Sequence, residues 1–157
     1  MTFYSPVNTT SRDIRLLTLH PGEWQDDIHC DLFVASLDQN PDYQTLSYTW
    51  GDSTSTKPLF INSIEVRATQ NLEAALRHIR HNAVSLTLWV DAICINQDNS
   101  AERTHQVSMM GQIYKSCTHC YMWLGCPDEY FKNDQRTPTE PVLDICELIF
   151  IHNHGFH

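Results

Sequence analysis

The chain has 157 residues, 41% of them hydrophobic, and a formal net charge of −9. Its length suits one domain that buries a core without disulfide bonds, and its acidic balance argues against nucleic acid as the main partner. It contains neither a run of about 18 apolar residues, as a membrane span requires, nor the charged and apolar regions of a secretory signal, so we expect a cytoplasmic protein.

Short runs of β-branched and aromatic residues between turn residues predict strands in the first half of the chain. The segment that ends at Trp50-Gly51-Asp52 alternates polar and apolar residues. The last two strands are joined by Asn62-Ser63 and should form a hairpin with a two-residue turn. The predicted strands cover residues 14–19, 30–34, 43–50, 59–61 and 64–66.

Helical periodicity predicts two helices. The first begins after Thr69, a favourable N-cap, and carries an apolar stripe at the spacing of one helix face (Leu72, Ala75, Leu76 and Ile79). The second covers residues 100–115, and its apolar face is predicted to hold Val107, Met110 and Tyr114, with Ile113 beside them.

A strand buried on both faces is predicted from Leu86 to Ile95, because the segment from Trp89 to Ile95 is nearly continuously apolar. Asp91 interrupts it and Asn96-Gln97 follow its end. A further strand is expected at 120–124, after the second helix, so that the two strands run parallel with a right-handed crossover. Polar groups at the carboxyl end of a buried strand lie where open α/β sheets bind ligands.

These segments resemble the fungal heterokaryon-incompatibility (HET) domain over about residues 14–125. The resemblance rests on ordered blocks: Tyr43, Leu46-Ser47-Tyr48, Trp50-Gly51-Asp52, Asn71-Leu72, Ala75-Leu76, Trp89 to Gln97, Glu102-Arg103, Gln106-Val107, Met110, Ile113-Tyr114 and Trp123-Leu124-Gly125. It implies a self/non-self recognition effector that triggers programmed cell death in filamentous fungi. The implied partners are further copies of the chain and other incompatibility or receptor proteins.

We expect a single α/β domain with a mostly parallel central sheet, helices on both faces and an antiparallel hairpin at Leu59–Val66. HET domains are thought to be similar to Toll/interleukin-1 receptor (TIR) domains, which implies a TIR/flavodoxin-like fold. The HET core is assigned to residues 1–125. A polar, proline-containing loop or linker is expected at 126–141, and a C-terminal helix at 142–157.

Two interpretations of Glu102 stay open. Asn99-Ser-Ala-Glu102 has the form of a capping box, in which the carboxylate reaches back to the N–H of the cap residue. The similarity to TIR domains, some of which hydrolyse NAD, implies instead that Glu102 is a catalytic glutamate. NAD would then be a substrate, and no cofactor is expected.

The other candidate residues would bind a substrate. Asp91 either faces a cleft or is held by backbone hydrogen bonds or by a pair with Arg103, because a buried carboxylate needs a partner. Trp50 could stack on a ring, Gly51 permits a sharp turn, and Asp52 offers a carboxylate. The predicted substrate-binding set is Trp50, Gly51, Asp52, Asp91, Asn96, Gln97 and Arg103.

The six cysteines are expected to be reduced thiols. Cys117-Thr-His-Cys120 is a C-x-x-C pair, but the second pair that a zinc site usually needs is missing from the sequence. We therefore predict no metal site.

Overall fold

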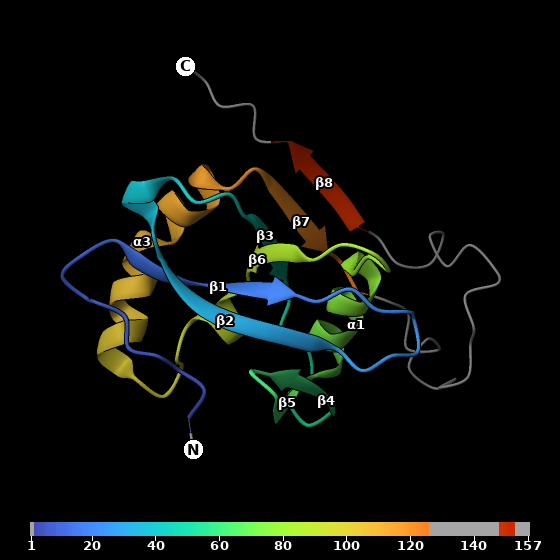
Figure 1. Cartoon of the computed structure of the whole chain (residues 1–157). Coiled ribbons are helices and arrows are strands. Elements are labelled where there is room, and N and C mark those ends of the chain that lie inside the picture. The colour runs from blue at the N-terminus through green and yellow to red at the C-terminus, as the bar shows by residue number, and fades with distance from the viewer. Residues whose placement is uncertain (1, 126–147, 153–157) are drawn as a thin grey trace.

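The computed structural model of the chain describes residues 2–125 and 148–152, and these residues form an eight-stranded sheet in the order β5-β4-β2-β1-β6-β3-β7-β8 (Figure 1). The strands are β1 Asp13–Leu19, β2 His29–Ser36, β3 Gln44–Tyr48, β4 Thr56–Ile61, β5 Ile64–Thr69, β6 Leu86–Trp89, β7 His119–Trp123 and β8 Leu148–His152. The helices are α1 Gln70–Ile79, α2 Asp91–Cys94 and α3 Ser100–Ser116, with a 3-10 turn η1 at Leu37–Gln39.

The sheet is mixed, so the prediction of a mostly parallel sheet is wrong. Four of its seven pairings are antiparallel: β1-β2, β1-β6, β4-β5 and β7-β8. The parallel pairings are β2-β4, β3-β6 and β3-β7. The short link between β1 and β2 makes an antiparallel pair, and β1 then lies antiparallel against β6 as well. This mixed sheet does not confirm the TIR/flavodoxin-like fold that the resemblance implied.

Several local predictions are confirmed. Strands β4 and β5 form the expected antiparallel hairpin, in which Ile61 pairs with Ile64. Helix α1 begins after Thr69, whose side-chain oxygen accepts a hydrogen bond from the N–H of Leu72. Strands β6 and β7 run parallel to each other with β3 between them.

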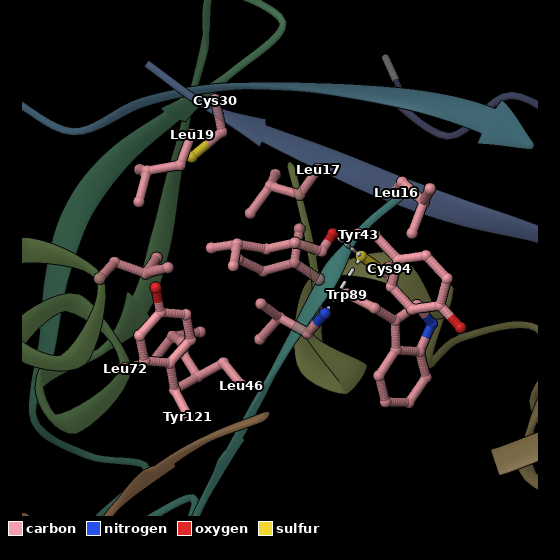
Figure 2. Close-up of a cluster of buried hydrophobic side chains, with 14 of the residues drawn as sticks. Leu16, Leu17, Leu19, Cys30, Tyr43, Leu46, Leu72, Trp89, Cys94 and Tyr121 are labelled. Atoms are coloured by element: carbon pink, nitrogen blue, oxygen red, sulfur yellow. Dashed lines mark hydrogen bonds between the residues drawn. The ribbon is translucent and has the colours of Figure 1, made fainter. Parts of the chain in front are cut away.

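The core surrounds the middle of the sheet. Four consecutive residues of β1, Ile14 to Leu17, are at most 2% exposed. Because side chains alternate across a strand, β1 is covered on both faces. Helix α1 packs against β4 and β5 and α2 against β1. Figure 2 shows members of this core from β1, β2, β3, β6, β7, α1 and α2.

The buried strand predicted from Leu86 to Ile95 is confirmed as far as Trp89 and wrong beyond it. Strand β6 ends at Trp89, and Asp91–Cys94 form the helical turn α2. The N–H of Cys94 donates to the carbonyl of Val90 over 2.7 Å. Val90, Ile93 and Cys94 are buried, and this spacing is that of one helix face. A short apolar run fits either a buried strand or a helical turn. Here the run forms a turn that packs against β1.

Helix α3 forms where predicted, but its buried face differs from the prediction. Val107 is 52% exposed, whereas Glu102, Gln106, Met109 and Ile113 are buried. Two of these four are polar and find their partners on or beside β1, as described below. Of the predicted face, Ile113 is buried and Met110 and Tyr114 pack partly buried against the core. Only Val107 was wrongly included, and the polar part of the buried face was missed.

The predicted linker at 126–141 lies outside the described residues, as does most of the predicted C-terminal helix. The described part of that helix, Leu148–His152, is instead strand β8, which pairs antiparallel with β7. None of the helices in the described ranges is long and apolar enough to cross a membrane.

Candidate functional site

Three parallel strands, β6, β3 and β7, end at one side of the sheet, which we call the carboxyl edge. Tyr48 pairs with Trp123 at the ends of β3 and β7. The segments that follow the strands are Trp50-Gly51-Asp52 after β3, Val90-Asp91 after β6 and Leu124-Gly125 after β7. The resemblance motifs thus meet at one edge, where sheets with parallel strands place ligands.

Asn71, in the first turn of α1, joins two of these segments. Its Nδ2 donates to the carbonyl of Thr49 over 2.6 Å, and its Oδ1 accepts from the indole N–H of Trp123 over 2.8 Å. Gly51, with φ +71°, lies so close that an added Cβ would be 3.4 Å from the Cβ of Asn71. Asn71 therefore fixes the geometry of the carboxyl edge, a role that sequence reasoning missed.

Trp50 and Asp52 face outward at this edge. The indole of Trp50 is 48% exposed, and its N–H donates to Asp91 over 3.4 Å. The carboxylate of Asp52 accepts from the N–H and hydroxyl of Thr54 over 2.8 and 2.7 Å, and these bonds lower the pKa of Asp52. The Asp52 carboxylate is thus held in a turn at the surface.

Asp91 opens α2, and its carboxylate accepts the N–H of Ala92 over 2.7 Å. Burial raises the pKa of Asp91, and the bonds from Ala92 and Trp50 oppose the shift. The predicted pair with Arg103 is wrong. Within residues 2–125 no ion pair joins Arg103 to Asp91, and the Arg103 guanidinium donates to the carbonyl of Gln97 over 2.9 Å.

Glu102 makes half of the predicted capping box. Its N–H donates to the side chain of Asn99 over 3.1 Å, as expected. Its carboxylate, however, does not return to the N–H of Asn99. One oxygen accepts the N–H of Asn96 over 2.9 Å, and both oxygens contact the Arg15 guanidinium, the second over 3.1 Å. The residue is 4% exposed.

Arg15, which sequence reasoning also missed, completes this buried network. The guanidinium donates to the carbonyls of Ser5 and Cys94 over 2.6 and 3.3 Å, and it lies 4.7 Å from the centre of the Tyr4 ring. Arg15 is 2% exposed in the middle of β1. The sequence contained one signal for this pair, because Arg15 is a single cation within the apolar run Ile14 to Leu19. A cation buried in such a strand needs a carboxylate partner.

A cavity of about 210 Å³ opens beside the carboxyl edge. Trp50 and Gln97 are the predicted site residues that line it, together with apolar residues of β4, β5, α1 and α2 and with Phe3 and Tyr4. The side-chain N–H of Gln97 donates to the carbonyl of Asp91 over 3.2 Å. The cavity is not lined by the other six predicted site residues, which are Gly51, Asp52, Asp91, Asn96, Glu102 and Arg103. The predicted set is therefore not gathered around one cavity.

The cysteines in the described ranges, Cys30, Cys94, Cys117 and Cys120, are free thiols. Burial raises the pKa of Cys94 to about 12, and Figure 2 shows this residue in the core near Trp89. Within the described residues, no three His, Cys, Asp or Glu side chains are grouped as a metal site requires.

A family model described as "Heterokaryon incompatibility protein (HET)" matches residues 43–146. The chain belongs to the HET family. It is also 40% identical over 133 residues to "Heterokaryon incompatibility protein 6, OR allele" of Neurospora crassa, an alignment that covers 76% of this chain and 20% of that protein. The chain thus corresponds to about a fifth of the length of this curated relative. No solved structure matches it.

The HET match includes the whole carboxyl edge and Glu102 but begins after β1. Glu102 is therefore inside the matched range and its partner Arg15 is outside it. Arg15, the buried partner of Glu102, is thus supplied by β1, which lies before the matched range.

Proposed function

We propose that this HET domain is a self/non-self recognition effector in the cytoplasm of a filamentous fungus. It acts through self-assembly and through contacts with other incompatibility or receptor proteins, and it triggers programmed cell death when incompatible hyphae fuse. Family membership and the name of the Neurospora relative support a role in heterokaryon incompatibility. The route from assembly to cell death is part of the proposal.

The state of Glu102 is the observation that favours an interaction module over an enzyme. Its carboxylate is buried and already bonded to the Arg15 guanidinium and the N–H of Asn96. A carboxylate that stabilises a developing positive charge must reach the reacting atom. The alternative function, NAD hydrolysis by Glu102, would therefore require this buried pair to open.

The carboxyl edge offers a surface for protein contacts. Trp50 and Leu124 are 48% and 51% exposed, and Gly51 and Gly125 beside them both lie against the side chain of Asn71. Large exposed apolar side chains that lie together are typical of interaction sites, and tryptophan is enriched among residues that dominate binding.

Inducible expression of the chain in a filamentous fungus tests this proposal. Leu124→Ser should reduce cell death and the self-association seen by cross-linking, because it removes apolar area from the carboxyl edge. Val84→Ser is a matched control, since Val84 is 55% exposed and precedes β6 at its opposite end. Equal killing by both variants would contradict the proposed surface.

NAD measurements separate the two mechanisms. The interaction mechanism predicts that concentrated purified chain leaves NAD intact and releases no nicotinamide. Consumption of NAD by the purified chain would instead favour the hydrolase.

A further inference from the structure

The cavity beside the carboxyl edge is built from segments far apart in the chain. Phe3 and Tyr4 form one part of its wall, and Tyr48 and Trp50 at the end of β3 form another. The hairpin β4-β5, the start of α1 and the turn α2 close the rest. Aromatic rings from two separate segments therefore border one space.

The volume of the cavity limits what it can hold. An apolar cavity of about 150 Å³ in a protein interior is known to hold one benzene ring. At about 210 Å³, this cavity has room for one ring with a small substituent. This volume lies below that of typical ligand pockets, about 300–1,000 Å³, so the cavity suits a ligand of about one substituted ring.

The lining carries polar groups with unused hydrogen-bonding capacity. The hydroxyl of Tyr48 makes no hydrogen bond to any residue of the described ranges. The Thr69 oxygen accepts from Leu72, which leaves its proton to donate. Gln97 donates through its nitrogen to Asp91, which leaves its side-chain oxygen as an acceptor. Donors and an acceptor are thus available for a ligand that has both functions.

The lining lacks a free charge, as far as the described residues show. Its single ionisable side chain with a full charge is Arg67, whose guanidinium already donates to the hydroxyl and the carbonyl of Thr56 over 3.1 and 2.9 Å. A charged ligand would lose its hydration without gaining an ion pair, which is costly in an apolar site. The cavity chemistry therefore favours a neutral ligand.

We propose that this cavity is a binding site for a small, neutral, planar aromatic molecule that carries a hydrogen-bond acceptor and donor, such as an aromatic carboxamide. The ring lies among the aromatic side chains and its polar group meets Tyr48, Thr69 and Gln97. Trp50, half exposed at the mouth, is then covered by the ligand. This site does not depend on the function proposed above.

Titration of the isotope-labelled chain with benzamide, followed by NMR at the indole N–H of Trp50, tests the site. Benzamide should give a saturable shift and should bind at least tenfold more tightly than benzoate, its charged counterpart. It should also bind more tightly than cyclohexanecarboxamide, which lacks the planar ring. Absence of a saturable shift, or equal binding of benzoate or cyclohexanecarboxamide, would overturn the proposal.

Variants locate the binding. Tyr48→Phe should weaken benzamide about two- to tenfold, the effect of one hydrogen bond, and leave toluene binding unchanged. Ala68→Leu fills the cavity from β5 and should abolish binding, whereas Ala83→Leu makes the same exchange at an exposed position and should not. If Ala68→Leu does not fold, Ala92→Leu fills the cavity from α2. Undiminished binding by a folded, filled variant would place the ligand elsewhere and refute the site.

Discussion

Two neighbouring regions of this HET domain hold their acidic residues in opposite ways. In the interior, Glu102 is 4% exposed and is paired with Arg15. At the carboxyl edge, Asp52 lies at the surface and accepts hydrogen bonds from Thr54 in its own turn. The comparison indicates that the carboxylate in the buried position stabilises the fold, and that the exposed position is the one available to a partner.

The largest expected effect comes from breaking the buried pair. Glu102→Gln should destabilise the chain by about 3–5 kcal/mol, because it leaves the Arg15 charge buried without its counter-ion. Urea unfolding followed by circular dichroism measures this change. The double variant Arg15→Met/Glu102→Leu should recover most of the loss, since it removes both charges.

The exposed pair between Arg12 and Asp38, 2.7 Å apart, is the control for that experiment. Their side chains are 44% and 61% exposed, so Asp38→Asn, which removes the charge of the pair as Glu102→Gln does, should cost no more than about 1 kcal/mol. A similarly small loss for Glu102→Gln would mean that the buried pair is dispensable, and it would return Glu102 to the list of catalytic candidates.

Local structure was predictable wherever neighbouring residues determine it. Thr69 and Asn99 were recognisable as caps, and in the structure their side chains accept from the N–H groups of Leu72 and Glu102. The hairpin β4-β5 was recognisable from two short strands around Asn62-Ser63, and both turn residues have the positive φ that such a turn requires.

The prediction failed where residues far apart in the chain decide the outcome. The buried face of α3 depends on Arg15, which pairs with Glu102, and on the carbonyl of Asp13, which accepts from the side chain of Gln106 over 2.9 Å. No periodicity within the helix reveals such partners. The same holds for the sheet order, because the place of β1 between β2 and β6 depends on pairings that the local sequence does not specify.

At the carboxyl edge, the next largest effect is expected from Asn71→Ala. This change leaves the indole N–H of Trp123 and the carbonyl of Thr49 without their partner and should cost about 1–3 kcal/mol. Asn71→Asp keeps the acceptor for Trp123 and should lose less than Asn71→Ala does. Thermal unfolding of the two variants measures the difference. Equal losses would mean that the hydrogen bond from Trp123 to Asn71 contributes little to stability.

Asp91 provides a pH test between the two regions. Because burial raises its pKa in the folded state, the folded chain binds this proton more tightly than the unfolded chain does. The contribution of Asp91 to stability is therefore fully present below its ordinary pKa and is lost as the pH rises through the raised value. Asp91→Asn removes this loss, so its stability relative to wild type should increase as the pH rises from 3 to 7. If Asp91→Asn instead lost stability at pH 7, an ion pair of Asp91 would be indicated.

Substitutions of Asp52 should change the stability of the fold least. A charge reversal at this residue should nevertheless have a large effect on recognition. Asp52→Asn keeps an oxygen that can accept from Thr54, and the residue is exposed, so the unfolding midpoint should not change. Asp52→Lys also leaves the core untouched, but it reverses a charge beside Trp50 on the proposed contact surface. We expect Asp52→Lys to fold normally and to lose self-association and cell-death activity, because a reversed charge at an interface repels its former partner. Full activity of a folded Asp52→Lys variant would remove this part of the carboxyl edge from the interface and leave Leu124 as the residue to follow.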